Sequence, residues 1–596
     1  MARLLHLLAL PCSEGLFMSA VPMQHINART KRRTPPKRRE LPPGTIELSL
    51  FAPTITHASV MGDFSDWGDR KMTKYADGTW RLTFNVPDGD YEYKFRVRTK
   101  SWFYKPGQWV TITDPMATRI SSENGNGILR VRGGRAVVDE YRWRHDHVLL
   151  PPNNQLIIYE LHVADFTGGE EDPHERGQFK HVTTRLDYLA DLGVNCLELL
   201  PIKEFPGDYS WGYTPQYLFA PESAYGPTED LKRLIDEAHA RGMRVILDGV
   251  YNHGHTDHPL AQIDHDYWFH HQPKDINQSW GPQYNYEHYD ADFDVWPARK
   301  FITENIAYWV REYHIDGIRY DAAKQIDNWD SLRMMRETAV TAAGNKAFIN
   351  VAEHLPEDPN LCGPLESGRP MDAVWHDTFF WRIANDAIAH GQVDLGAIKA
   401  CLNPLARGFA DCAQVVNYVS NHDHHRLLPH MAKAQGVFDD AAFARAKLAG
   451  TVLLTAVGIP MIFMGEEFGE YKEKTHHAAK IDWSLLKNQR NQELLTHYKK
   501  LVALRKSVTA LQQNHLEFFH ENTAANVLAY RRSAEGRDVV VVANFGGGHH
   551  DHYHISGWPG DGQWLDVLAA STFGVGGGGA VLQLAPHQAR VFVRPG

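Results

Sequence analysis

Cysteine is scarce in this chain of 596 residues. Its five cysteines are widely separated and form no C-x-x-C pair, so we predict neither a disulfide framework nor a cysteine zinc site. Such usage is typical of a reducing compartment, and we expect a cytoplasmic protein. Long apolar runs are lacking too. None approaches the roughly 18 residues that span a bilayer, so we expect no membrane partner.

Positive charge is also in deficit. The net charge of −10 disfavours a general affinity for nucleic acid or for anionic membranes. The composition, with 43% hydrophobic and 22% charged residues, is that of a globular protein. Residues 1–44 differ from the rest because they are basic, contain proline and show no periodic pattern. We expect a disordered tail there.

Two predicted all-β parts flank the centre of the chain. Residues 45–125 contain short runs of alternating polarity separated by turns such as Asp77-Gly78, which predicts a small β-sandwich. Residues 510–596 show a similar pattern and predict a second β-sandwich, with a flexible loop at Gly574–Gly579. The pattern of Asn488–Lys506, just before it, is typical of a helix.

Residues 150–505 alternate between apolar strands and helical stretches, which predicts a (β/α)8 barrel, also called a TIM barrel. The connection after the third strand, residues 253–294, is too long for an ordinary loop, so we expect a small excursion domain. The predicted strands are Leu156–Tyr159, Val194–Leu200, Val245–Leu247, Gly317–Tyr320, Phe348–Ala352, Ala373–Trp375, Val415–Val419 and Pro460–Met464.

Polar residues stand at the ends of several predicted strands. A barrel gathers the carboxyl ends of its strands on one face, so we expect these side chains to lie together. A lone carboxylate there can be a satisfied structural group, but three from three strands are hard to bury without a purpose. The set comprises Asp248, His253, Arg319, Asp321, Glu353, His422 and Asp423.

Carboxylates that face one another develop different pKa values, one ionised as a nucleophile and another protonated as an acid. This is the apparatus of glycoside hydrolysis. Arg319 lies on the same face as Asp321, two residues away, and we expect it to keep that carboxylate ionised. Phosphoryl transfer and zinc-protease chemistry are poorly supported, because no G-x-x-x-x-G-K-[ST] and no H-E-x-x-H occur.

Four segments in this set resemble the signature regions of the α-amylase superfamily, glycoside hydrolase family 13. They occur in the order and with the gaps of that family, and the likeness runs from about Leu156 to the end of the chain. The segments are Asp248-Gly249-Val250-Tyr251-Asn252-His253, Gly317-Ile318-Arg319-Tyr320-Asp321-Ala322-Ala323-Lys324, Val351-Ala352-Glu353 and Ser420-Asn421-His422-Asp423.

The sandwich predicted for residues 45–125 resembles a family 48 carbohydrate-binding module. The likeness rests on Met61-Gly62-Asp63-Phe64-Ser65-Asp66-Trp67 and Gly89-Asp90-Tyr91-Glu92-Tyr93-Lys94-Phe95. Four tryptophans of this part could stack on sugars, although we expect most of them to belong to its core. They are Trp67, Trp80, Trp102 and Trp109.

The resemblance implies a retaining mechanism on an α-glucan substrate. Asp321 would be the nucleophile that forms a covalent glycosyl-enzyme, Glu353 the acid/base, and Asp423 the stabiliser of the distorted sugar. A retaining pair of carboxyl groups stands about 5–5.5 Å apart, and we expect that spacing between Asp321 and Glu353.

The resemblance also implies substrate-binding residues around this trio. Arg319 would orient the nucleophile, and Asp248 would support the site. His253 and His422 would bond sugar hydroxyls, and Tyr213, in Ser210-Trp211-Gly212-Tyr213-Thr214-Pro215, matches a stacking tyrosine of the family.

No cofactor is predicted. Some relatives hold a structural calcium near the position of Asn252, but the sequence does not predict one here. The histidine-rich run that begins at His253 suggests zinc, yet the loop is long and polar and nothing in it fixes a ligand geometry, so a solvated loop is favoured.

The acceptor of the glycosyl group decides the reaction. Water gives an amylase-type hydrolase, and the 6-hydroxyl of a glucan gives a 1,4-α-glucan branching enzyme. Branching relatives usually place an acidic residue directly after the equivalent of Asp423, where this chain has His424 and His425. Lys324 places a cation where a linear chain would leave, so we expect an α-1,4-glucan hydrolase. Branching remains the alternative, and a non-catalytic glucan-binding protein the remote one. The oligomeric state is left open.

Overall fold

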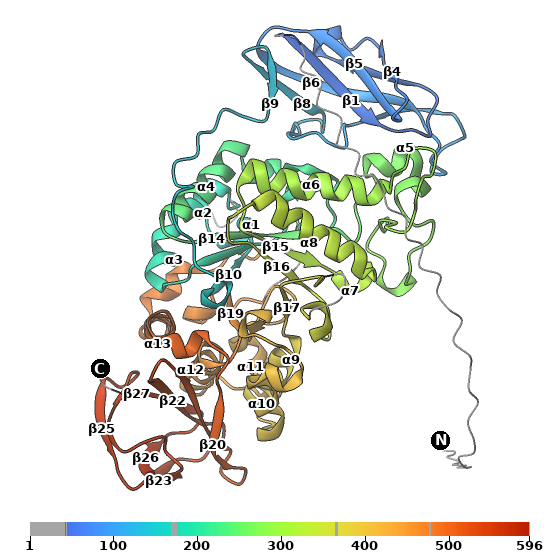
Figure 1. Cartoon of the computed structure of the whole chain (residues 1–596). Coiled ribbons are helices and arrows are strands. Elements are labelled where there is room, and N and C mark those ends of the chain that lie inside the picture. Colours follow the sequence, from blue (N-terminus) through green and yellow to red (C-terminus); the bar gives the residue numbers. More distant parts are fainter. Residues whose placement is uncertain are drawn as a thin grey trace, which may run out of the picture. The chain divides into compact units, whose positions relative to one another are not determined.

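The computed structural model describes residues 42, 44–168, 176–363, 368–473, 475 and 478–594. The tail predicted for residues 1–44 therefore lies outside the described residues, apart from Pro42 and Gly44. Three folded parts follow one another along the described chain (Figure 1). In this part of the chain no helix is both long enough and apolar enough to pass through a membrane.

The first part is a β-sandwich, which confirms the predicted fold. One sheet has the order β1-β5-β4, and the other has the order β3-β2-β6-β8-β9 with β7 paired to β6. Its strands are β1 (Thr45–Phe51), β2 (Ala58–Gly62), β3 (Arg70–Lys71), β4 (Thr73–Lys74), β5 (Thr79–Asn85), β6 (Gly89–Arg98), β7 (Trp109–Ile112), β8 (Gly127–Arg132) and β9 (Arg135–Val137).

Alternation along these strands builds the core of the sandwich. Ile46, Leu48 and Leu50 of β1 are buried, whereas the residues between them face outward, as a strand with one buried face requires. The expectation that most tryptophans of this part are core residues is wrong. Trp80 is 6% exposed, but the other three, Trp67, Trp102 and Trp109, are 36%, 54% and 40% exposed. Trp67 and Trp102 lie in loops, and Trp109 is on the exposed face of β7, opposite the buried Val110 and Ile112.

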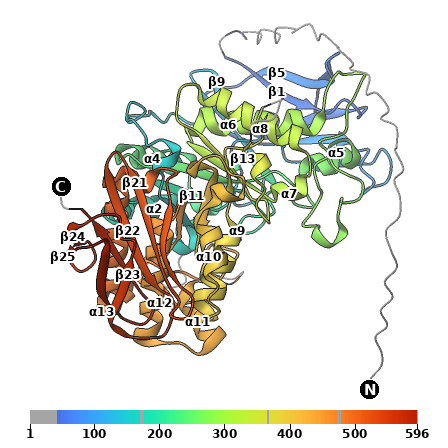
Figure 2. The ribbon, with the colours of Figure 1, turned by 60° about the horizontal axis from the view of Figure 1, so that its bottom comes forward.

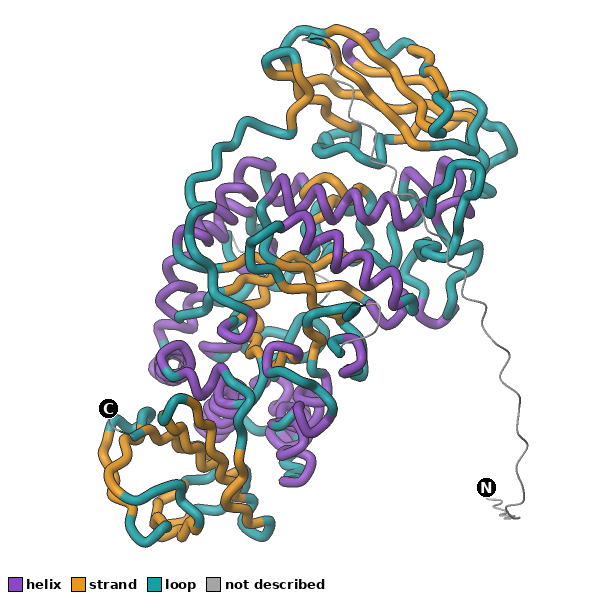
Figure 3. The backbone as a smooth tube through the Cα atoms, viewed as in Figure 1, coloured by secondary structure: helices purple, strands orange, loops and turns teal. Residues whose placement is uncertain are grey.

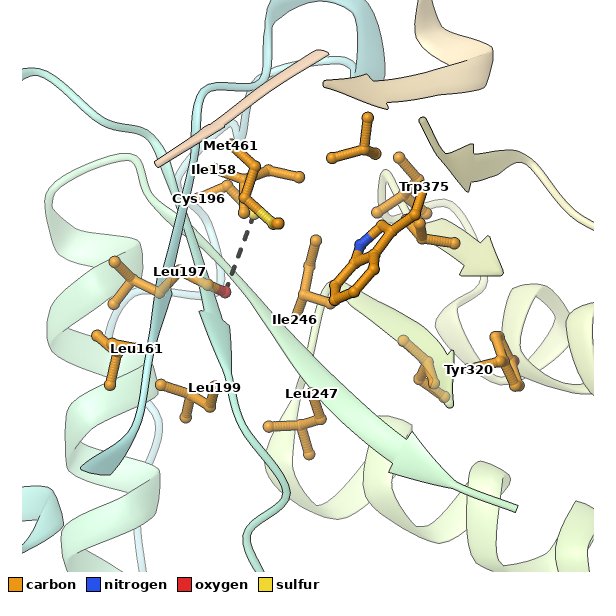
Figure 4. Packing of buried hydrophobic residues seen from close by; sticks show 14 of the residues in the cluster. Ile158, Leu161, Cys196, Leu197, Leu199, Ile246, Leu247, Tyr320, Trp375 and Met461 are labelled. Atoms are coloured by element: carbon orange, nitrogen blue, oxygen red, sulfur yellow. Dashed lines mark hydrogen bonds between the residues drawn. The ribbon is translucent and has the colours of Figure 1, made fainter. Parts of the chain in front are cut away.

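The central part is a closed barrel of eight parallel strands, as predicted. Every strand residue is buried because helices cover the outside of the barrel and side chains fill the inside (Figures 3 and 4). The strands, in barrel order, are β10 (Ile158–Leu161), β11 (Cys196–Leu199), β14 (Arg244–Val250), β15 (Gly317–Asp321), β16 (Ile349–Ala352), β17 (Ala373–Trp375), β18 (Val415–Tyr418) and β19 (Ile459–Phe463).

Helices alternate with these strands. The long ones carry an apolar stripe that packs on the barrel, for example Leu231, Leu234 and Ile235 of α4. The helices are α1 (Val163–Phe166), α2 (Phe179–Thr184), α3 (Leu186–Leu192), α4 (Thr228–Ala240), α6 (Pro297–Tyr313), α7 (Ala323–Ile326), α8 (Trp329–Ala343), α9 (Asp377–Phe379), α10 (Leu395–Leu402), α11 (Leu427–Gln435) and α12 (Asp439–Thr455), with a π-helical turn at Phe380–Ala389.

The excursion after β14 contains helix α5 (Pro259–Trp268) and isolated β-bridges, of which one joins His253 to Gln283. A separate two-stranded sheet, β12 (Lys203–Glu204) with β13 (Tyr217–Pro221), lies in the connection after β11. Contacts tie the sandwich to α5: the Thr99 hydroxyl donates to the Gln262 carbonyl at 2.6 Å, and the Trp102 indole N–H donates to Asp266 at 3.1 Å.

The last part is all-β, as predicted, and helix α13 (Gln489–Ser507) precedes it. Strands β21 and β22 stand near α12 and α13 in Figure 2, and α12 contacts β27. The strands are β20 (Glu517–Asn522), β21 (Val527–Ala534), β22 (Arg537–Asn544), β23 (His550–Ser556), β24 (Gly562–Asp566), β25 (Ser571–Val575), β26 (Gly579–Leu584) and β27 (Gln588–Val593). They form the sheets β20-β21-β22-β27-β24-β25 and β23-β26.

The loop predicted at Gly574–Gly579 is shorter than expected. Gly574 belongs to β25, Gly579 begins β26, and a tight turn joins the two strands. Gly577 and Gly578 adopt positive φ there, and the carboxylate of Asp561 accepts both of their amide N–H groups at 3.0 and 2.9 Å. Glycine makes this turn accessible, and the side-chain cap holds it.

Candidate active site

The polar residues predicted at the strand ends come together at one end of the barrel. Asp248 on β14 pairs in register with Arg319 on β15, and Asp321 is the last residue of β15. Glu353 follows β16 directly, while His422 and Asp423 lie in the loop after β18. Four of the eight strands thus deliver these side chains to a common cluster.

Arg319 is the centre of this cluster. One terminal nitrogen, Nη1, donates to Asp248 at 2.7 Å and to Asp321 at 3.0 Å, and the other, Nη2, lies 3.0 Å from Glu353. The guanidinium is fully buried, and its plane lies 4.1 Å from the ring centroid of Trp375. Because a guanidinium has a fixed fork of donors, Arg319 holds the carboxylates of Asp321 and Glu353 close together at adjacent nitrogens.

The backbone between the two strands also contributes. Ala322 has φ 47°, in the left-handed region that a residue with a Cβ rarely adopts. In this conformation its amide N–H donates to Oε2 of Glu353 at 2.7 Å. Strain of this kind persists where the surrounding structure imposes it, and it concentrates at functional sites. Both described contacts of Glu353 are made by Oε2.

Electrostatics in the cluster favour retention of a proton. Burial raises the pKa of Asp321, and although the Arg319 guanidinium opposes this rise, the Glu353 and Asp248 carboxylates reinforce it, so the pKa of Asp321 lies well above its usual range. Arg319 thus acts on Asp321 in the direction that we expect, toward the ionised form, while burial and the neighbouring carboxylates act against it. Several carboxylates share one guanidinium, and such groups titrate as a coupled set.

Tyr213 and His422 form the other wall of the cluster. The Tyr213 hydroxyl donates to Asp248 at 2.6 Å and lies 2.7 Å from Nε2 of His422. The two rings are stacked, with centroids 5.1 Å apart. Nε2 of His422 is also 3.2 Å from Asp423, whose side chain is 48% exposed and is the most open of the predicted trio. Asp321 and Glu353 are 12% and 16% exposed.

His253 contacts the cluster through Tyr213. Its Nε2 lies 2.7 Å from the Tyr213 carbonyl, so the ring donates there, and Nδ1 faces the amide nitrogen of Asn252 at 3.2 Å. Burial lowers the pKa of His253 to about 4, which keeps the ring neutral at neutral pH. Both ring nitrogens bond to the protein in this arrangement, which fixes the loop that carries Tyr213.

The surroundings of Asn252 do not fit a calcium ion. The amide oxygen of Asn252 accepts a hydrogen bond from Gln283 at 3.1 Å, and its nitrogen is turned to His253. Lys203 is buried, and its ammonium nitrogen lies 3.8 Å from the ring centroid of Tyr251, the residue before Asn252. Across the described residues, no group of three or more His, Cys, Asp or Glu could hold a metal ion. The histidines His265 and His271 both bond to Asp266 instead.

The expectation that water is the acceptor of the glycosyl group depends on two residues, Lys324 and His424. Lys324 is exposed, and its ammonium donates to the Leu355 carbonyl at 2.8 Å, next to the loop that carries Glu353. His424, which directly follows Asp423, stacks on Phe380 with centroids 3.7 Å apart and bonds to Asp377 at 3.1 Å.

Sequence reasoning missed two carboxylates that lie inside the barrel. Glu160 on β10 contacts His422, and Glu198 on β11 is its register partner. Both are 1% exposed. The available signal was a charged residue within an apolar strand, in Tyr159-Glu160-Leu161-His162 and in Leu197-Glu198-Leu199.

The chain matches three family models. The catalytic domain of α-amylase matches residues 158–300 and 285–487, carbohydrate-binding module 48 (isoamylase N-terminal domain) matches residues 36–117, and the C-terminal all-β domain of α-amylase matches residues 519–593. The catalytic model covers more than half of the chain, and the protein belongs to the α-amylase family, glycoside hydrolase family 13. It is an enzyme of the glycoside hydrolase and transferase type that acts on α-glucans.

Curated relatives have different activities. The chain is 28% identical to malto-oligosyltrehalose trehalohydrolase of Saccharolobus solfataricus over 499 residues, covering 74% of this chain and 82% of that protein. It is 26% identical to 1,4-alpha-glucan branching enzyme GlgB of Novosphingobium aromaticivorans over 586 residues, with 90% and 78% covered. It is also 26% identical to pullulanase of Bacillus subtilis over 568 residues, with 83% and 76% covered.

Solved structures share the fold. The pullulanase of Anoxybacillus sp. LM18-11, complexed with maltotriose, superposes with a TM-score of 0.77 at 22% identity, over 93% of this chain and 85% of that one. Type I pullulanase of Bacillus subtilis, complexed with maltose, gives 0.75 at 23% identity, over 93% and 84%.

Proposed function

We propose that this protein is a retaining α-glucan hydrolase of the α-amylase type, which cleaves α-1,4 bonds of glycogen, starch or maltodextrin. One observation carries the choice of water as acceptor. His424, the residue after Asp423, is held against Asp377 and Phe380, so no carboxylate follows Asp423 at the place where a branching site has one. Two of the relatives named above, a trehalohydrolase and a pullulanase, bear names of hydrolases.

The carboxylates divide the chemistry between them. Asp321 attacks the anomeric carbon and forms a covalent glycosyl-enzyme, while Glu353 gives its proton to the departing glycosidic oxygen. Glu353 then takes a proton from water, which attacks the same carbon and releases Asp321 with retained anomeric configuration. Asp423 stabilises the positive charge that develops on the sugar.

The remaining residues hold this trio in place. Arg319 orients Asp321 and Glu353, and Asp248 supports Arg319 and Tyr213. Tyr213 offers its ring to the reacting glucose, and the ring of His422 stacks beside it. We assign His253 to support of the Tyr213 loop, because its ring nitrogens are engaged with the protein.

Incubation with amylose tests the proposal. Reducing ends are measured over time, before and after treatment with isoamylase, and pullulan serves as a second substrate for α-1,6 cleavage. We expect reducing ends to rise from the start with few new α-1,6 linkages. If reducing ends stay flat while isoamylase-releasable chains accumulate, the protein is a branching enzyme, which its 26% identity to GlgB proteins keeps as the alternative. Cleavage of pullulan alone would indicate a debranching enzyme, and no reaction at all a glucan-binding protein.

Lys324 provides a prediction on substrate length. An ammonium group has three donors, and the Leu355 carbonyl uses one, so two remain for hydroxyl groups of the departing chain. We expect Lys324→Ala to raise KM for longer maltooligosaccharides several-fold while kcat changes less. Lys500→Ala is the matched control. Lys500, on α13, is also exposed and donates to the backbone carbonyl of Leu568. A change in KM that is equal for short and long substrates in Lys324→Ala would contradict this role.

A reducing compartment also fits the described cysteines. Cys196, Cys362, Cys401 and Cys412 are all buried and unbridged. We therefore place the enzyme in the cytoplasm, where thiols stay reduced.

A further inference from the structure

Glu160 contacts His422, which in turn contacts the candidate catalytic residue Asp423. It stands on β10, is 1% exposed, and faces the loop after β18. Its Oε1 is 2.6 Å from Nδ1 of His422, and its Oε2 accepts the backbone N–H of His422 at 3.1 Å. A bidentate contact of this kind fixes both the ring and the backbone of His422.

The surrounding hydrogen bonds determine how many protons His422 carries. Asp248 accepts from the Arg319 guanidinium, and it also accepts the Tyr213 hydroxyl proton at 2.6 Å. Because the Tyr213 hydroxyl already donates to Asp248, its oxygen acts as the acceptor for Nε2–H of His422, at 2.7 Å. Glu160 accepts a backbone N–H with one oxygen and faces Nδ1 with the other, so it acts as the acceptor there too. Both ring nitrogens of His422 therefore bear protons.

We propose that Glu160 is a positioning residue for glycosyl transfer, which holds His422 in its doubly protonated form with Nε2–H aimed at Tyr213 and Asp423. The inference rests on the retaining mechanism proposed above. Through His422, Glu160 keeps a positive charge 3.2 Å from Asp423, the carboxylate assigned to the developing charge on the sugar.

The other charged groups around His422 are acidic or distant from its nitrogens. Burial opposes the charged ring, but the carboxylates of Asp423 and Glu160 outweigh it and raise the pKa of His422 to about 10. The groups that face this position from the neighbouring elements are Glu160 on β10, Glu198 on β11, Tyr213 in the loop before β13, Asp248 on β14, Arg319 and Asp321 on β15, and Asp423 on its own loop. Burial, reinforced by the neighbouring Glu160 carboxylate, raises the pKa of Glu198 well above its usual range and so disfavours its charged form.

Glu160→Gln tests this assignment with α-maltotriosyl fluoride as substrate. Fluoride leaves without a proton, so the alkaline limb of kcat/KM for its release does not report the acid Glu353. Glutamine removes the negative charge, and the pKa of His422 falls. We expect kcat/KM at neutral pH to fall about 10- to 100-fold, and the alkaline limb to move down by at least about one pH unit.

Glu198→Gln is the matched control. It is the same substitution at the neighbouring register position, equally buried, and neither oxygen of Glu198 has a hydrogen-bond partner within the described chain. Glu198→Gln is expected to leave kcat/KM and the alkaline limb unchanged. A Glu160→Gln enzyme with a wild-type rate and profile, or an equal shift in both variants, would overturn the proposal.

A double-mutant cycle shows whether Glu160 acts through His422. In a His422→Asn background, Glu160→Gln should lower kcat/KM by less than a further threefold, because the side chain that Glu160 positions is gone. Full additivity of the two losses would refute the assignment. If Glu160→Gln does not fold, Glu160→Asp replaces it in the test. The retained negative charge should leave the alkaline limb of kcat/KM in place while kcat/KM at neutral pH falls. An alkaline limb that moves would contradict the proposal. A wild-type protein that releases no fluoride instead defeats the proposed function.

Discussion

Asp321→Asn is expected to lower kcat on maltoheptaose by about 10⁴-fold or more, while the affinity for this substrate stays within a few-fold of wild type. The amide has the shape of the carboxylate and can still accept from Nη1 of Arg319, which donates at 3.0 Å in the native site. It cannot form a stable glycosyl ester, so the covalent route is lost. Stopped assays of reducing ends give the rate, and calorimetric titration gives the affinity.

Asp327→Asn is the control for this substitution. Asp327 lies six residues further on, is exposed, and has φ 47°, a conformation that asparagine adopts as readily as aspartate. Its activity and melting temperature should equal those of the native enzyme. If Asp321→Asn keeps near-normal turnover while folded, another residue is the nucleophile.

Glu353→Gln is expected to lower kcat on maltoheptaose by about 10³-fold, because proton transfer to the leaving oxygen is lost. The loss should depend on the leaving group. With α-maltotriosyl fluoride the first step needs no acid, so we expect a rapid burst of fluoride equal to the enzyme concentration. Slow release follows, because water is no longer activated. The covalent intermediate that accumulates is detectable by mass spectrometry of the protein.

The matched variant for this test is Glu337→Gln. Glu337 lies on α8, pairs with Arg333 and has a side chain that is 59% exposed. It should behave as wild type with both substrates. Equal losses of Glu353→Gln on maltoheptaose and on the fluoride would mean that Glu353 is not the acid, and would assign it only to support of Arg319.

Much of the fold could be predicted because it follows from local periodicity. Parallel strands buried on both faces are uniformly apolar, and amphipathic helices separate them, so each of the eight predicted barrel strands overlaps an observed one. The exposed tryptophans of the sandwich could not be placed in this way. Trp67 and Trp102 lie in loops, which have no alternating pattern, and Trp109 begins a strand of four residues, too short for alternation to stand out in the sequence. At Gly574–Gly579 the composition indicated flexibility, but a cap from Asp561 holds the turn.

The barrel, the two β-domains and the candidate trio Asp321, Glu353 and Asp423 follow from local sequence, because each motif is a short segment at a strand end. Only the tertiary structure decided how these residues are held. Arg319 joins carboxylates from three strands, and Glu160 meets His422 across 262 residues of chain. Such contacts arise when the first strand and the seventh approach the same barrel interior, and no local pattern encodes a partner at that separation. The protonation of His422 is decided there too, since it depends on which oxygens face the two ring nitrogens.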